Sequence, residues 1–140
     1  MIAIASTDDE IRNCFATMKQ LRPHIEKNTY IATMRGMMKE GYQLAYLKND
    51  VGLVSCVAGF KISHNLFLGK HLYVEDLVTA ETARASGHGS KIFEWLVAYA
   101  KTEHCLAIDL DSGVQRHAAH KFYLNQGMKI VCYHFLAEFA

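Results

Sequence analysis

The sequence contains little that would divide the chain or direct it to a special environment. It has one proline, no repeat and no tract rich in proline, glycine and serine, so it offers no linker at which a domain boundary would fall. No apolar stretch approaches the roughly 20 residues that span a membrane. The start MIAIASTDDEIRN lacks the basic and apolar regions of a signal peptide. We therefore expect one domain over residues 1–140, in the cytoplasm and with no membrane partner.

The chain also lacks an excess of charge of either sign. The chain carries 15 basic and 14 acidic residues, has a net charge of +1 and contains no block of like charge. This balance gives no electrostatic reason to expect nucleic acid as a partner. The four cysteines are scattered without a C-x-x-C pair, and each lies among apolar neighbours. Their spacing favours reduced core thiols over disulfides or metal ligands.

Hydrophobic periodicity predicts the element order β-α-α-β-β-β-α-β-α-β. Ser6 or Thr7 is expected to cap a first helix that runs to Pro23, and a second helix spans about 29–39. The later elements are expected to be strands around the turn KND, strands in HLYVEDLVTA, CLAIDLDS and the closing MKIVCYHFLAEF, and helices over 89–104 and in QRHAAHKFYLNQG. A strand, a crossover helix and a strand imply a parallel pair. The predicted class is α/β or α+β with a mixed sheet.

Two glycines stand where the strand HLYVEDLVTA gives way to a helix, in the pattern Arg84-x-x-Gly87-x-Gly89 followed by Ser90. Unpaired N–H groups and the helix dipole favour an anion at such a point, and glycine lets a phosphate approach without a Cβ clash. The spacing fits neither a P-loop nor the G-x-G-x-x-G dinucleotide fingerprint. Taken alone, the turn is as well explained by a purely conformational role.

Two further segments change that balance. The strand before the turn carries Glu75-Asp76-Leu77-Val78, and the last helix carries Ala119-x-x-Phe122-Tyr123 followed by Gly127. In this order and spacing, the three segments resemble the GNAT superfamily of N-acetyltransferases, in particular its short single-domain bacterial members. The resemblance implies a mixed, mostly antiparallel sheet with a central splayed parallel strand pair, flanked by about four helices.

The resemblance also implies a coenzyme site for acetyl-CoA. The pyrophosphate would be cradled by Arg84, Ala85, Ser86, Gly87, His88, Gly89 and Ser90. The pantetheine arm would pair with the strand Leu77, Val78 and Thr79, and the thioester would enter a gap between the strands that start at His71 and Cys105. Arg116 stands where many members have an asparagine. A guanidinium there is still able to contact the coenzyme, but an amide contact is not expected.

Catalytic roles follow from the acceptor's chemistry. A simple alkylammonium has a pKa of about 10, so a proton must leave before the amine attacks. Glu75 is the first candidate for the base, since it lies on the strand beside the implied coenzyme gap. Asp76 would point to the opposite face of a regular strand unless a bulge intervenes. The resemblance places Tyr123 as the general acid and a backbone N–H near Leu77 as the donor to the acetyl oxygen.

Other polar residues have weaker claims. Asp111, which shares a strand face with Asp109, is an alternative for acceptor binding or proton removal, and so is His134. A water held by backbone carbonyls is a further alternative for proton removal. His24 and Tyr30 lie between the first two predicted helices, where family members close over the acceptor. His117 and His120 are three residues apart, but no third ligand has matching spacing, so no metal is expected.

The predicted function is therefore transfer of an acetyl group from acetyl-CoA to the primary amine of a small molecule, by direct attack in a ternary complex. Two alternatives stay open: a non-catalytic acyl-CoA-binding module, and an acetyltransferase directed at proteins. Dimers are frequent among proteins of this kind, so a homodimer is compatible with the resemblance.

Overall fold

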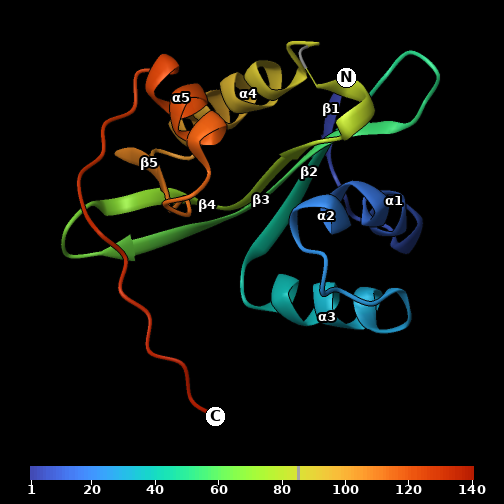
Figure 1. The fold of residues 1–140 in the computed structure, drawn as a ribbon, viewed down its shortest axis with the longest axis horizontal. Helices are drawn as coiled ribbons and strands as arrows, with labels where there is room; N and C mark the ends of the chain where they lie inside the picture. Colours follow the sequence, from blue (N-terminus) through green and yellow to red (C-terminus); the bar gives the residue numbers. More distant parts are fainter. Residues whose placement is uncertain (85) are drawn as a thin grey trace. The chain divides into compact units, whose positions relative to one another are not determined.

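A computed structural model describes residues 1–84 and 86–140 (Figure 1). Contacts divide the chain into two compact units, Met1–Asp109 and Leu110–Ala140. The elements are β1 (Ile2–Ile4), α1 (Asp8–Asn13), α2 (Phe15–Leu21), α3 (Lys27–Lys39), β2 (Tyr42–Lys48), β3 (Val54–Asn65), β4 (Gly69–Thr79), the 3₁₀ helix η1 (Glu81–Ala83), α4 (His88–Thr102), β5 (Ala107–Leu110) and α5 (His117–Asn125). No helix within the described ranges is long and apolar enough to cross a membrane.

The five strands form one sheet in the order β1-β2-β3-β4-β5. The pairs β1–β2, β2–β3 and β3–β4 are antiparallel, whereas β4 and β5, which α4 connects, are parallel. This arrangement confirms the predicted fold class. The parallel pair, however, includes the last strand of the described sheet instead of lying at its centre.

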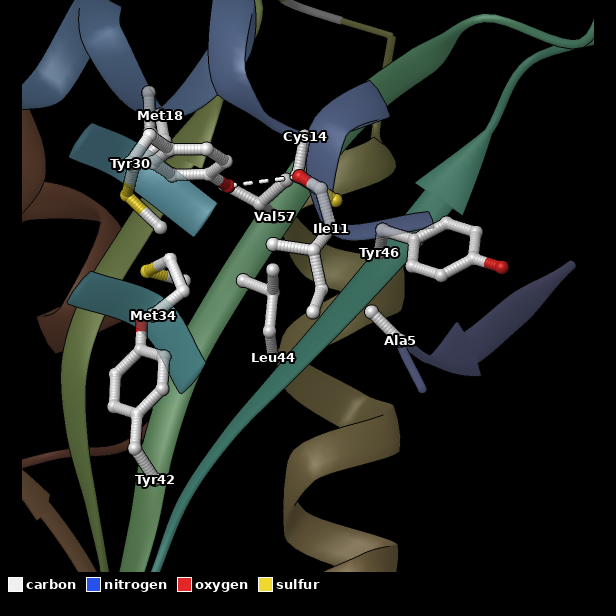
Figure 2. Packing of buried hydrophobic residues seen from close by; sticks show 11 residues of the cluster. Ala5, Ile11, Cys14, Met18, Tyr30, Met34, Tyr42, Leu44, Tyr46 and Val57 are labelled. Atoms are coloured by element: carbon white, nitrogen blue, oxygen red, sulfur yellow. Dashed lines mark hydrogen bonds between the residues drawn. The ribbon is translucent and has the colours of Figure 1, made fainter. Parts of the chain in front are cut away.

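Helices cover both faces of the sheet in the first unit (Figure 1). On one face, Leu44 and Val57 pack with Ile11 and other buried residues of α1–α3 (Figure 2). On the other face, the Phe60 ring lies 6.1 Å from that of Trp95 and 5.5 Å from that of Tyr99, both on α4. The alternation of side chains along β2 and β3 therefore builds two cores, and the sheet is buried from both sides.

The first helix begins as predicted, at a Thr7 cap. The Thr7 hydroxyl accepts from the Glu10 N–H at 3.1 Å, and the Glu10 carboxylate accepts from the Thr7 N–H at 3.0 Å, which completes a capping box. The expectation of one helix up to Pro23 is wrong, because α1 ends at Asn13 and α2 begins at Phe15. Between them, the Cys14 thiol lies 3.4 Å from the Glu10 carbonyl while the Cys14 N–H bonds to Ile11 instead.

Two expectations for the C-terminal end need correction. The segment MKIVCYHFLAEF belongs to no strand, and residues 128–140 are extended after α5 (Figure 1). A strand needs a neighbour to supply its ladder of hydrogen bonds, and strand-like composition alone does not supply one. The expectation of four core thiols holds for Cys14 and Cys56, but Cys105 is half-buried and Cys132 is exposed.

Candidate active site

A β-bulge interrupts β4 at the acidic pair. Gly59 lies opposite Asp76 and Phe60 lies opposite Val74, which leaves Glu75 as an extra residue on β4. A bulge redirects side chains that a regular strand would alternate between faces. Asp76 lies on the Tyr42 side of the sheet, because its Oδ2 accepts a hydrogen bond from the Tyr42 hydroxyl, and the negative charges of Asp76 and Glu75 both raise the pKa of that hydroxyl. A regular strand would send Glu75 and Asp76 to opposite faces, and this bulge removes that expectation.

Both carboxylate oxygens of Asp76 are engaged. Its Oδ1 accepts from Arg22 Nε at 2.8 Å, and its Oδ2 accepts from the Tyr42 hydroxyl at 2.8 Å. Arg22 also donates to the Glu75 carbonyl oxygen at 2.9 Å. Gly59 makes room for this network, because a Cβ there would overlap the Tyr42 hydroxyl and lie 2.7 Å from Asp76 Oδ2. Asp76 is thus an ordered anion whose oxygens already accept hydrogen bonds.

The Glu75 carboxyl is in a different environment. Partial burial is the main cause that raises its pKa, and the negative charge of Asp76 raises the pKa further. The positive charges of Lys61 and Arg22 lower it by smaller amounts. A carboxyl with a raised pKa binds a proton more readily than an ordinary one, which is what a general base requires.

A cavity of about 460 Å³ lies beside Asp76, between the sheet and the first helices. Asp76, Arg22 and Tyr42 form its polar wall. The other lining residues come from α2, α3 and the segment between them: Met18, His24, Ile25, Glu26, Thr29, Tyr30, Thr33, Met34 and Met37. His24 and Tyr30, which the sequence placed near the acceptor, are thus cavity residues. The Tyr30 ring is part of the buried core, and its hydroxyl donates to the Ile11 carbonyl at 2.9 Å (Figure 2).

The glycine turn lies at the start of α4. Gly87 is left-handed, with φ of 84°, and nothing lies within 4 Å of where its Cβ would be. Gly89 lies inside the first turn of α4, which has no side-chain cap and no acidic residue. An uncapped helix N-terminus with open space beside it fits a phosphate group. Ala85, which the resemblance includes in this cradle, lies outside the described residues.

His88 connects the turn to the sheet. Its Nδ1 lies 2.8 Å from the hydroxyl of Ser55, a buried residue that is itself extra on β3, between the pairs Leu47–Cys56 and Lys48–Val54. The Ser55 hydroxyl donates to the Leu47 carbonyl at 3.1 Å, so it accepts the hydrogen bond from His88 Nδ1–H. The hydrogen bond fixes where α4 begins relative to β3. On the remainder of the turn, the Arg84 N–H bonds to the Glu81 carbonyl and the Ser86 hydroxyl donates to the Ala83 carbonyl.

The second half of β4 extends past β5. The Leu106 N–H donates to the Lys70 carbonyl at 2.7 Å, and β5 then continues for four residues only. Leu77, Val78 and Thr79 therefore lie beyond the end of β5, with β3 on their other side. An unpaired strand edge of this kind is able to hydrogen-bond the amides of an extended ligand.

The second unit holds the remaining predicted site residues. Burial raises the pKa of the Tyr123 hydroxyl, and the charge and hydrogen bond of Arg116 partly offset that rise. His134 Nδ1 lies 3.0 Å from Asp111 Oδ2. The rings of His117 and His120 lie 5.9 Å apart, and His120 Nε2 bonds to the Gly113 carbonyl at 2.7 Å.

Sequence reasoning missed the residues that support the acidic pair. Arg22 and Tyr42 carry no motif, and they reach Asp76 from 54 and 34 positions away along the chain. Gly59 did give a signal, because glycine inside a strand marks a bulge or a close approach. Ser55 resembles any other serine in an apolar strand, and only its register with β2 reveals its role.

Comparisons with known proteins support an acetyltransferase. Residues 8–128 match the model of the Acetyltransferase (GNAT) family. The chain is 29% identical to the uncharacterized N-acetyltransferase YhdJ of Bacillus subtilis over 133 residues, which cover 93% of this chain and 92% of that protein. It is 28% identical to the aminoalkylphosphonate N-acetyltransferase of Salmonella typhimurium over 89 residues, 63% of this chain and 56% of that one.

A solved structure shares the fold. An aminoglycoside N-acetyltransferase in complex with CoA superposes with a TM-score of 0.85, at 12% identity, over 99% of this chain and 94% of that one. The family match spans the N-terminal helices, the glycine turn and the motif on α5. The chain belongs to the acetyltransferase (GNAT) family, whose members use acetyl-CoA.

Proposed function

We propose that this acetyltransferase transfers an acetyl group from acetyl-CoA to the primary amine of a small molecule that binds in the cavity beside Asp76. The observation that carries the proposal is the bulge at Glu75 on β4, next to Asp76 of the cavity wall, where burial and the Asp76 charge raise the pKa of the Glu75 carboxyl. Glu75 and Asp76 together attract an ammonium group. Glu75 then removes its proton, since the oxygens of Asp76 are held by Arg22 and Tyr42.

The proposed reaction uses two protein groups to move its protons. The free amine attacks the thioester carbonyl, a C–N bond forms and the C–S bond breaks. A backbone N–H near Leu77, beyond the end of β5, would stabilise the charge on the acetyl oxygen. The ammonium gives one proton to Glu75 before the attack, and Tyr123 gives a proton to the departing thiolate. The nitrogen gives up its second proton as the amide forms, and that proton restores the Tyr123 hydroxyl. The raised pKa of Tyr123 keeps that hydroxyl protonated at neutral pH.

The cavity favours an acceptor with an apolar body. Three methionines and Ile25 line it, and thioether side chains adapt to apolar ligands of irregular shape. Arg22 is already bonded to Asp76 and to the Glu75 carbonyl, so it is less available for a phosphonate. We therefore expect an alkyl or arylalkyl amine to be preferred over amino sugars and aminoalkylphosphonates. An acceptor as large as a folded protein would reach the cavity only through an exposed lysine.

Release of CoA thiol over a panel of amines tests this function. The panel contains alkylamines, phenylethylamine, an amino sugar, an aminoglycoside, aminoethylphosphonate and a lysine peptide. Release with the apolar amines supports the proposal. Release with the phosphonate or sugar amines alone would contradict the apolar pocket, and release only with the peptide would indicate a protein acceptor.

Tyr123→Phe tests the acid. The change removes one hydroxyl and keeps the ring, so folding and coenzyme binding should survive. Loss of a positioned general acid should lower turnover by a factor on the order of 10² to 10⁴. Stopped-flow measurement of the chemical step is the readout, and Tyr133→Phe, on the exposed C-terminal segment, is the matched control. Unchanged chemistry in Tyr123→Phe would leave the ring with a packing role.

A further inference from the structure

The segment 22–26, which joins α2 to α3, forms one side of the cavity. Four of its five residues line the cavity: Arg22, His24, Ile25 and Glu26. The fifth, Pro23, ends the helical pattern after α2, because its ring nitrogen has no hydrogen to donate. Irregular backbone of this kind leaves carbonyl groups without the partners that a helix would supply. The contacts that hold the segment therefore decide the shape of this cavity wall.

Lys19, in the last turn of α2, bonds to this segment at two points. Its Nζ donates to the Pro23 carbonyl at 3.0 Å and to the Ile25 carbonyl at 2.7 Å. An ammonium group has three hydrogens, so one lysine is able to hold both carbonyls at once. Hydrogen bonds from a charged donor are roughly twice as strong as those between neutral groups. Lys19 thus ties the segment to the helix that precedes it.

The same ammonium group lies beside a pair of aromatic rings behind the cavity. Lys19 Nζ is 5.8 Å from the centroid of the Phe15 ring. The Phe15 ring meets the Tyr30 ring edge-on, with their centroids 4.9 Å apart, and Tyr30 lines the cavity. Phe15 belongs to α2 and Tyr30 to α3. Lys19 therefore lies where the two helices and the segment between them meet, and among the described residues it is not one of those that line the cavity.

We propose that Lys19 is a positioning residue for the acceptor, because it holds the segment 22–26 in the conformation that binds the amine. This role rests on the proposed function, which assigns the cavity to the acceptor. A wall that is ordered beforehand costs less free energy to fix when a ligand binds than a mobile wall does. Lys19 therefore affects binding of the amine and not the transfer step, in which Glu75 and Tyr123 move the protons.

Lys19→Met separates binding from chemistry, because it keeps an unbranched side chain beside Phe15 and removes the donors. The Michaelis constant for the amine should rise on the order of tenfold, since two exposed hydrogen bonds are lost. Turnover at saturating amine should not change, because Arg22 keeps its own hydrogen bonds to β4. Lys19→Arg retains a charged donor and should restore most of the affinity. Lys39→Met is the matched control, since Lys39 is likewise an exposed basic residue in the last turn of its helix.

Hydrogen exchange at single amides, measured by NMR, tests the role of Lys19 without any need for activity. The Ile25 N–H bonds to the Arg22 carbonyl at 3.2 Å, and in Lys19→Met it should exchange faster than in the wild type and in Lys39→Met. Unchanged exchange would overturn the proposal, and so would faster exchange with an unchanged Michaelis constant for the amine. Failure of the proposed function is visible in the wild type alone, as the absence of CoA thiol release with every amine of the panel, and it would remove the acceptor role of Lys19 whatever the exchange shows.

Discussion

Two β-bulges interrupt neighbouring strands of the sheet, one at Ser55 on β3 and one at Glu75 on β4. The two bulged residues have different surroundings. Ser55 on β3 is buried, and its hydroxyl holds His88 at the start of α4. Glu75 on β4 is half-buried, carries a titratable group and precedes Asp76, which lines the cavity together with residues of α2 and α3. One irregularity therefore positions the turn proposed to bind the coenzyme, and the other places the carboxyl proposed to react with the acceptor.

The difference shows how one sheet can organise two halves of a reaction. A regular ladder would send Glu75 and Asp76 to opposite faces. The bulge interrupts that alternation, and the two carboxylates differ in their contacts, because hydrogen bonds hold Asp76 and not Glu75 in the described network. The bulge at Ser55 supplies no reactive group, so its loss should affect binding of the coenzyme and spare the chemistry.

Substituting the reactive bulge should have the largest effect. We expect Glu75→Gln to lower turnover by a factor on the order of 10² to 10⁴, which is typical of a lost general base. The affinity for acetyl-CoA, measured by titration calorimetry, should stay the same. Glu26→Gln changes another carboxylate of the same cavity and should leave turnover within about twofold of wild type. A rise in the Michaelis constant for the amine alone would instead indicate that Glu75 only attracts the acceptor.

A side chain at Gly59 should disturb the hydrogen bonds around Asp76 without changing the Glu75 carboxyl itself. In Gly59→Ala, the new methyl group overlaps the Tyr42 hydroxyl, so the hydrogen bond to Asp76 must break. Overpacking of this kind costs about 1–3 kcal/mol of the free energy of unfolding, measurable by urea denaturation. Acetylation should fall as well, because Asp76 loses a donor that fixes its position. A fully active and fully stable Gly59→Ala protein would contradict the importance of the network; Gly52→Ala, in the open β2–β3 turn, controls for the methyl group.

Removing the Ser55 hydroxyl, in the bulge on β3, should have a smaller effect, on coenzyme affinity alone. Ser55→Ala takes away a hydrogen bond of His88, and a typical hydrogen bond is worth about 1 kcal/mol, or about fivefold in the dissociation constant of CoA. The Michaelis constant for the amine should not change. Ser63→Ala, a half-buried serine further along β3, is the control. Were Ser55→Ala to slow the chemical step at saturating coenzyme, the division of tasks between the two bulges would fail.

A change outside both bulges should affect stability alone. Hydrogen bonds from Tyr46 and from the Thr7 and Ser6 region hold the pKa of Glu10 at about 2 in the folded protein, whereas an unfolded glutamate titrates at about 4.3. Stability from Glu10 is therefore complete above the unfolded value and is lost as the pH falls toward 2. Glu10→Gln should accordingly be less stable than wild type at pH 7 and approach it at pH 3, in urea titrations. Equal deficits at both values would contradict this linkage, and turnover should be unaffected.

Much of this architecture was predictable because it depends on local patterns. The capping box at Thr7, the end of α3 before Gly41 and the stripe of α4 all follow from spacing along the chain. The two bulges were not predicted: Gly59 signals a bulge or a close approach without distinguishing them, and the register shift itself is a property of two strands together. The prediction of a closing strand was wrong for a different reason: the segment has the composition of a strand, but composition alone does not supply the hydrogen bonds of one.

The candidate site, like the fold, was predictable only in part. The motifs identified Glu75, the glycine turn and Tyr123 as candidates, and their roles remain predictions. The environment that distinguishes Glu75 from Asp76 depends on Arg22, Tyr42 and Gly59, which long-range packing brings to β4. Chemistry that is set by such contacts cannot be read from a motif.

The pH dependence of the single-turnover rate, measured for the wild type, Glu75→Gln and Asp76→Asn, tests the central claim most directly. With Glu75 as the base, the wild-type rate should rise with pH through a midpoint above that of an ordinary carboxyl, because burial and Asp76 raise its pKa. That limb should disappear in Glu75→Gln. In Asp76→Asn it should move to lower pH, since the neighbouring negative charge is gone. A Glu75→Gln protein that keeps its chemical rate and an unaltered profile would contradict the account.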